Sequence, residues 1–181
     1  MTTMTETTVT TQVYRVYIKA TPQAIWDAIT KPEWTDRYGY GGTVEGDLRS
    51  GAPYRILAGT GMQAAGVSGP VIDGELIEVD PPRKLVQTWR ALWDPHIVAE
   101  GFTRVTWDIE EDDGGVTRLT VTHELEGAPR TADQVASVAR LHEDGGGWSW
   151  ILSDLKTLLE TDKSPVASHA FGARALDGLT K

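Results

Sequence analysis

The chain has no cysteine, and this absence excludes disulfides, thiolate metal ligands and cysteine nucleophiles. It has no asparagine either, so it contains no N-glycosylation sequon. No apolar run approaches the roughly 20 residues that cross a bilayer. Residues 1–11 are rich in threonine and lack the basic start and apolar core of a signal peptide. We therefore expect a cytoplasmic protein without membrane insertion.

Positive charge is also scarce, with 17 Lys and Arg against 26 Asp and Glu and a net charge of −9. Nucleic-acid binding depends on basic side chains at phosphates, and anionic membranes attract the same side chains. The balance argues against both partners. The length of 181 residues suits a single domain. We assign it to residues 12–162, between flexible tails at 1–11 and 163–181.

Strand patterns dominate the chain. Residues 12–19 alternate with one apolar face, and Thr21-Pro22 then forms an N-cap and first-turn pair that starts a short helix. Pro32 breaks that helix, and residues 33–38 can add one more turn. Further strands are predicted over 43–48, 53–58, 71–80, 84–92, 102–111 and 116–125. Because no strand has a helix of its own, we expect an antiparallel sheet.

Two helical patterns follow the sheet. Thr131-Ala132-Asp133-Gln134 has the form of a capping box, and it predicts a helix that carries His142 on its apolar face. Gly145–Gly147 then breaks the pattern. The helix that begins near Trp148 has an apolar stripe, with Asp154, Lys156 and Glu160 opposite it.

Few motifs carry chemistry. Gly59-Thr60-Gly61-Met62-Gln63-Ala64 matches a loose dinucleotide fingerprint, but Gly66, Gly69 and Pro70 leave no room for the helix that such a site needs. His123-Glu124 and His142-Glu143 are adjacent pairs whose members point in different directions, so they do not form a metal-ligand set. We therefore expect no metal and no cofactor.

His123 is the most informative polar residue of the sheet. It shares a strand face with Leu119, Val121 and Leu125, the face that should be covered. It is either a core histidine with a satisfied ring or a hydrogen-bonding or proton-transfer group in a cavity. His142 has the same ambiguity. The seven tryptophans, against two phenylalanines, fit either core filling or a pocket for a flat apolar ligand.

Four stretches resemble a known family. They are Ile18-Lys19-Ala20-Thr21-Pro22 with Ile25–Thr30 and Glu33-Trp34; Gly74-Glu75 with Glu78–Trp89; Leu119–Glu124; and Gly147-Trp148 with Leu152, Leu155 and Leu159. In this order they are similar to the START-like, Bet v 1-like superfamily called SRPBCC. Within it they are similar to the branch named after the activator of the Hsp90 ATPase.

The resemblance implies an α+β helix-grip fold. A curved antiparallel sheet of about seven strands wraps around a long C-terminal helix, two short helices follow the first strand, and a cavity lies between sheet and helix. Related domains bind lipids, hormones or polyketides, and some cyclise polyketides or protect against toxic natural products. The family carries no universal catalytic motif.

Three hypotheses stay open. The first is a binder of a small hydrophobic, aromatic or polycyclic molecule of polyketide or lipid type, with a role in natural-product metabolism or resistance. The second is a cyclase or hydrolase with His123 or His142 as general base, helped by Asp73, Glu75 or Tyr54. The third is a chaperone-linked protein-interaction module. The predicted ligand-binding residues are Trp26, Trp34, Tyr54, Trp89, Trp107, His123, His142 and Trp148. The oligomeric state is left open, with a homodimer as one alternative, and so is whether Gly145–Gly147 gates the cavity.

Overall fold

The computed structural model describes residues 10–137 and 146–164. Their core is one seven-stranded antiparallel sheet with the order β1-β7-β6-β5-β4-β3-β2. The strands are β1 (Thr11–Ile18), β2 (Gly42–Gly46), β3 (Pro53–Ala58), β4 (Pro70–Asp80), β5 (Lys84–Ala91), β6 (Thr103–Glu111) and β7 (Thr117–Glu124). Each lies within two residues of its predicted bounds. The expected antiparallel architecture is confirmed.

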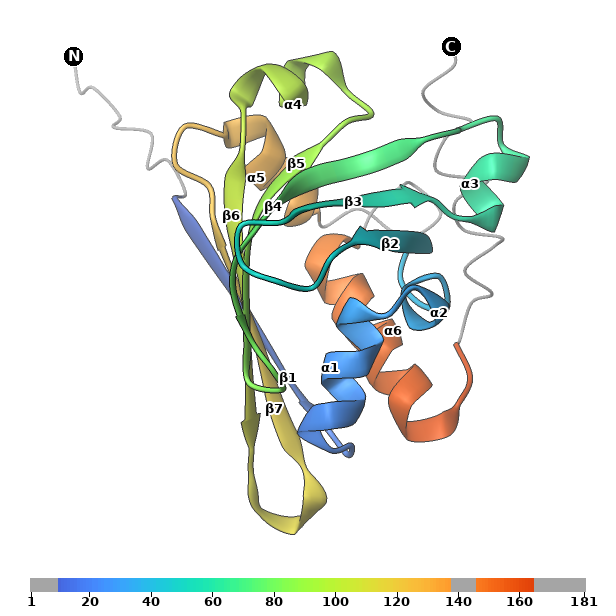
Figure 1. Cartoon of the computed structure of the whole chain (residues 1–181), viewed down its shortest axis with the longest axis vertical. Helices are drawn as coiled ribbons and strands as arrows, with labels where there is room; N and C mark the ends of the chain where they lie inside the picture. The colour runs from blue at the N-terminus through green and yellow to red at the C-terminus, as the bar shows by residue number, and fades with distance from the viewer. Residues whose placement is uncertain (1–9, 138–145, 165–181) are drawn as a thin grey trace, which may run out of the picture.

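The helices are placed around this sheet (Figure 1). They are α1 (Pro22–Thr30), α2 (Pro32–Thr35), α3 (Thr60–Ala64), α4 (Pro95–Glu100), α5 (Pro129–Val135) and α6 (Gly147–Thr161), with one 3₁₀ turn at Asp113–Gly115 between β6 and β7. The long helix α6 and the pair α1 and α2 lie on the same side of the curved sheet, whereas α4 and α5 lie together at one end of it. This is the predicted helix-grip arrangement.

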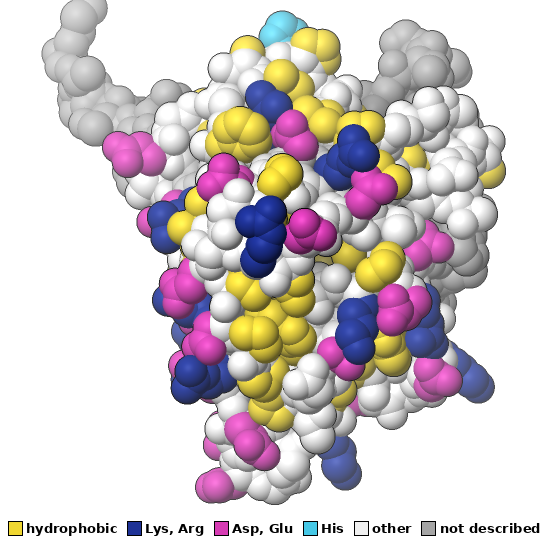
Figure 2. Space-filling model, viewed as in Figure 1, with side chains coloured by type: hydrophobic (Ala, Val, Ile, Leu, Met, Phe, Trp, Pro, Cys, Tyr) yellow, Lys and Arg dark blue, Asp and Glu magenta, His cyan; other side chains and the backbone are white. Residues whose placement is uncertain are grey.

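Alternation along the central strands sets the core. On β6, Val105, Trp107 and Ile109 are buried, and on β7, Leu119 and Val121 are fully buried. The covered face predicted for the strand of His123 is therefore confirmed. On the face shown in Figure 2, hydrophobic side chains run down the middle of the lower half, and charged side chains flank them.

The first helix begins as predicted. The Thr21 hydroxyl accepts a hydrogen bond from the Ala24 amide at 3.2 Å, and Pro22 occupies the first turn. Ile25, Trp26, Ala28 and Ile29 are buried against the sheet. The cap and the apolar face together hold α1 over the core.

Three local predictions are wrong. A five-residue helix, α3, does follow Gly59, although it connects β3 to an antiparallel neighbour and not to the parallel strand of a dinucleotide site. Thr131 does not cap α5, which begins two residues earlier at Pro129. Asp154 does not lie on the solvent side of α6 but is fully buried.

The expected tails fall largely outside the described residues, as does His142 with the helical pattern predicted around it. No helix of the described ranges combines the length and apolar character that crossing a membrane requires.

Candidate functional site

A continuous row of five rings runs through the core. Its neighbours are Trp93–Trp89 (6.4 Å between ring centroids), Trp89–His123 (5.3 Å), His123–Trp148 (6.0 Å) and Trp148–Trp107 (5.3 Å). All four pairs are edge-to-face, the geometry that aromatic rings favour. We call these five residues the aromatic row. It joins three strands of the sheet to the first turn of α6.

His123 sits at the centre of the aromatic row and is fully buried. The Trp148 indole N–H, which can only donate, donates to His123 Nδ1 at 3.1 Å. The ring proton therefore belongs on Nε2, which donates to Thr103 Oγ1 at 2.7 Å. The Thr103 hydroxyl in turn donates to the Trp89 carbonyl at 2.9 Å. Both ring nitrogens are thus satisfied within one chain of hydrogen bonds.

Burial lowers the pKa of His123 from 6.5 to about 4, because charging the ring would require desolvating a cation. The ring is therefore neutral at pH 7. A general base works best when its pKa lies near the operating pH and its nitrogen is accessible. His123 meets neither condition in this arrangement, which favours the interpretation as a core histidine.

The indole N–H of Trp107 is a buried donor without a hydrogen-bond partner among the described residues. Its side chain is 7% exposed, and its indole N–H has no acceptor among the described residues. A buried donor without a partner costs about 1–3 kcal/mol, so such groups are rare in native proteins. The Trp107 N–H is therefore available to an acceptor that is not a described residue.

The start of α6 is held tightly against its surroundings. The Gly147 amide donates to the Tyr40 hydroxyl at 2.9 Å. A Cβ on Gly147 would stand 2.1 Å from the Val135 carbonyl oxygen at the end of α5, and the φ of Gly147 is +49°. Only glycine fits both the approach and the backbone conformation. This close contact positions Trp148 over the sheet.

Farther along α6, Asp154 links the helix to the segment before β2. Its carboxylate accepts hydrogen bonds from the Gly39 amide at 2.9 Å and from the Ser164 hydroxyl at 2.7 Å. Burial raises the pKa of Asp154, an effect that these two donors oppose.

No ring contact among the described residues joins Trp26, Trp34 or Tyr54 to the aromatic row, and His142 lies outside those residues. Trp26 is buried in the core on α1, and Trp34 on α2 packs beneath the Arg37 guanidinium, 4.5 Å from its ring centroid. Tyr54 donates to the Thr88 carbonyl at 2.8 Å, and burial raises its pKa, so the phenol stays protonated. Of the predicted set, ring contacts between described residues join Trp89, Trp107, His123 and Trp148.

Asp73 and Glu75, the carboxylates considered as helpers of a general base, have other surroundings. Asp73 forms a two-bond ion pair with Arg90, at 3.0 and 2.7 Å, and Glu75 is exposed. Within the described ranges, no three histidine, aspartate or glutamate side chains converge as metal ligands would.

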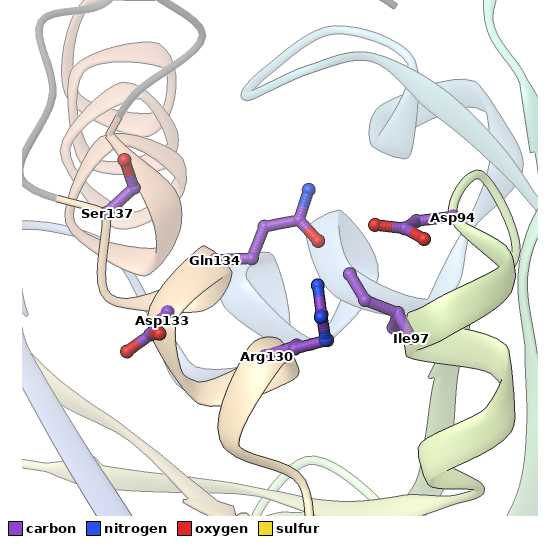
Figure 3. Close-up of a pocket in the computed structure, with 6 residues that line it drawn as sticks. All are labelled: Asp94, Ile97, Arg130, Asp133, Gln134 and Ser137. Carbon is purple, nitrogen blue, oxygen red and sulfur yellow. The ribbon is translucent and has the colours of Figure 1, made fainter.

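A hollow of about 370 Å³ opens between α4 and α5 (Figure 3). None of the residues that line it was predicted to be functional from the sequence. The signal it contained was Asp94-Pro95, an N-cap and first-turn pair like Thr21-Pro22, which marks the start of α4. The lining residues are Asp94, Ile97, Arg130, Asp133, Gln134 and Ser137. A second hollow, of about 300 Å³, is lined by Thr88, Phe102, Thr103, Arg104, Glu124 and Glu126.

Glu100 fixes α4 to α5 beside the first hollow. Its carboxylate accepts hydrogen bonds from the Arg130 amide at 2.8 Å, the Thr131 amide at 2.9 Å and the Thr131 hydroxyl at 2.7 Å. These bonds lower the pKa of Glu100 against an opposing effect of burial. A carboxylate from another helix thus does the capping that Thr131 was expected to do.

Solved structures share this fold. CalU16 from Micromonospora echinospora is 22% identical, with a TM-score of 0.57 over 92% of this chain and 84% of that one. DynU16, a putative protein in the dynemicin biosynthetic locus, is 23% identical, with a TM-score of 0.63 over 86% of this chain and 49% of its own. An HSP90 activator from Plasmodium falciparum is 20% identical, with a TM-score of 0.51 over 86% and 91%.

No curated protein matches the sequence. The family model described as activator of Hsp90 ATPase homolog 1-like protein matches residues 19–160, which include α1, α2, the strands from β2 to β7 and nearly all of α6. The chain therefore belongs to the activator of Hsp90 ATPase homolog 1-like family, the branch that its sequence resembles.

Proposed function

We propose that the protein binds a small aromatic or polycyclic molecule between the sheet and α6, against the aromatic row. The observation that carries this proposal is the buried Trp107 N–H, which has no acceptor among the described residues. A ligand oxygen that accepts this hydrogen bond would recover the cost of the unpaired donor. The ligand class is therefore an aromatic molecule with a carbonyl or hydroxyl oxygen, as in quinones and aromatic polyketides.

The aromatic row supports the same class of ligand. Its edge-to-face pairs offer ring faces and edges to a flat molecule, and rings bury large apolar areas at low entropic cost. Pockets of this kind combine apolar walls with a few placed polar groups. The Trp107 N–H would be the placed polar group of this pocket.

The state of His123 argues against this ring as the general base of an enzyme. A cyclase or hydrolase would need this ring to accept a proton from the substrate. Its Nδ1 already accepts from Trp148, its Nε2 donates to Thr103, and its pKa of about 4 makes it a weak base at pH 7. We assign His123 to holding Trp148 in place.

The interaction-module alternative requires a contiguous apolar docking patch. The exposed large hydrophobic side chains of the described residues are spread over several elements: Val13 and Tyr17 on β1, Leu48 before β3, Ile77 on β4, and Phe102 before β6.

The DynU16 locus supports a role in natural-product metabolism as the setting for a ligand-binding activity.

The proposal is tested with a matched ligand pair, 2-methyl-1,4-naphthoquinone and 2-methylnaphthalene, which share a ring system and differ in the oxygens. The chain has no cysteine for the quinone to alkylate. Indole N–H signals are followed by ¹⁵N NMR during titration, with Trp107→Phe used to assign the Trp107 signal. We expect the quinone to move that signal and to bind about tenfold more tightly than the hydrocarbon.

The matched control is Trp34→Phe, because Trp34 lies on α2 beneath Arg37. This variant should bind the quinone like the parent, whereas Trp107→Phe should lose the preference for the quinone. If neither compound moves any indole signal, and a wider panel of polyketides, sterols and fatty acids also leaves tryptophan fluorescence unchanged, the binding proposal is wrong.

A further inference from the structure

The hollow between α4 and α5 brings together polar side chains from two helices. In Figure 3, the Arg130 guanidinium and the Gln134 amide rise from α5 toward the Asp94 carboxylate and Ile97 on the opposite wall, whereas Asp133 points away from them. Convergence of a few polar groups over an apolar residue is typical of a ligand site.

The Arg130 guanidinium is exposed, and its charge lies close enough to the Glu100 carboxylate to contribute to the lowered pKa of that group. The neighbouring carboxylate of Glu100 uses its oxygens for the Arg130 and Thr131 amides and the Thr131 hydroxyl. Among the described residues, the Arg130 guanidinium forms no ion pair. Asp94 also has a bond of its own, accepting from the His96 amide at 2.8 Å as the N-cap of α4. A guanidinium of this kind suits the two oxygens of a carboxylate.

Ile97 belongs both to the lining of the hollow and to the buried core. Ile97 is 4% exposed and belongs to the same buried cluster as Trp89 and Val135. Asp94 directly follows Trp93, the outer end of the aromatic row. The hollow therefore borders the Trp93 end of the aromatic row, and Trp107 lies at the other end.

We propose that this hollow binds the anionic end of the ligand, so that the ligand is an aromatic carboxylate whose rings point toward Ile97 and Trp89. This inference rests on the proposed function, since it assigns the polar end of the same molecule. Arg130 pairs with the carboxylate and the Gln134 amide group donates to it.

The charge of Asp94 should oppose the binding of an anion in the hollow. Its carboxylate faces the Arg130 guanidinium and the Gln134 amide across the hollow, and it repels an anion bound between them. Replacing Asp94 by Asn keeps an N-cap of about equal strength and removes the charge. The variant Asp94→Asn should therefore bind the acid more tightly, whereas Arg130→Gln should bind it less tightly.

The test uses 2-naphthoate and 2-naphthamide, which share their rings and differ in charge, measured by isothermal titration calorimetry on the full chain. Because Arg130 is exposed, we expect Arg130→Gln to weaken naphthoate binding about two- to fivefold and to leave naphthamide binding unchanged. Asp94→Asn should strengthen naphthoate binding about threefold. The matched control Arg104→Gln makes the same change of net charge in the second hollow and should have little effect.

The outcomes separate the two proposals. Equal binding of acid and amide by the parent, or an equal loss of both in Arg130→Gln, overturns the assignment of the anionic end and leaves the aromatic site standing. Weaker naphthoate binding in Arg104→Gln to the same degree shows a long-range charge effect and also overturns it. Failure of the acid, the amide and the quinone to bind at all overturns the proposed function itself.

Discussion

The indole of Trp148 and the imidazole of His123 form a buried hydrogen bond of 3.1 Å between the first turn of α6 and the central sheet. Only one tautomer of His123 allows it, and that tautomer also satisfies Thr103. The bond ties the orientation of the helix to the protonation state of one ring.

Breaking this bond should destabilise the fold. Trp148→Phe leaves His123 Nδ1 buried without a donor, and we expect a loss of about 1–3 kcal/mol in the free energy of unfolding. Urea denaturation measures it, with an unchanged m-value. The control is His96→Ala on the exposed side of α4, which should change stability by less than about 0.5 kcal/mol. A neutral Trp148→Phe would show that the bond contributes nothing.

His123 should also make stability depend on pH. Its pKa is about 4 in the folded state against an ordinary 6.5, so the unfolded state binds more protons between these values. Stability is then fully present above pH 6.5 and falls as the pH drops toward 4, by up to about 3 kcal/mol.

The measurement is the difference in unfolding free energy between the parent and His123→Phe from pH 4 to 7.5. Glu100 and Glu160 also have lowered pKa values, and Asp154 has a raised one, but both proteins share these groups. The difference should therefore report His123. Parallel curves for the two proteins would contradict the neutral, buried ring.

Glu100 should be the cap that orders the start of α5. Glu100→Ala removes the acceptor for two backbone amides, and we expect a loss of about 1–2 kcal/mol. Hydrogen exchange at the Arg130 and Thr131 amides should become faster at the same time. Glu126→Ala, on an exposed residue, is the control and should leave both amides protected. Unchanged exchange in Glu100→Ala would mean that the amides have another partner.

Gly147 should not tolerate a side chain. Gly147→Ala places a Cβ 2.1 Å from the Val135 carbonyl oxygen and strains a residue at φ +49°, so we expect a loss of about 2–4 kcal/mol. Gly115→Ala is the matched control, because φ is +77° there and the added Cβ meets open space. The difference between the two isolates the contact with α5. Equal losses would show that backbone strain alone is responsible.

The sheet was predictable because its signal is local. Alternation places Trp107 and His123 inward on their own strands, and short turns such as Asp112–Gly115 join neighbours in sequence. The helix α4 was missed although Asp94-Pro95 marks its start, because six residues are too few for a helical period.

The site depended on contacts that no local pattern contains. Thr103 and Trp148 meet His123 across 20 and 25 residues of chain, so the tautomer could not be read from the sequence. Thr131 looked like a cap by its spacing, yet the acceptor comes from Glu100, 31 residues away. Asp154 was expected on the solvent side because it is charged, but hydrogen bonds from Gly39 and Ser164 satisfy its carboxylate in the core.

The buried carboxylate of Asp154 also affects how α6 is rotated about its own axis on the sheet. Leu152, Leu155 and Leu158 would pack against the sheet in several neighbouring orientations, because leucines make no directional contacts. Rotating the helix by one residue, about 100°, would carry the Asp154 carboxylate away from the Gly39 amide and break this buried hydrogen bond. One carboxylate therefore selects a single rotational setting of α6, and with it the setting of Trp148 two turns earlier.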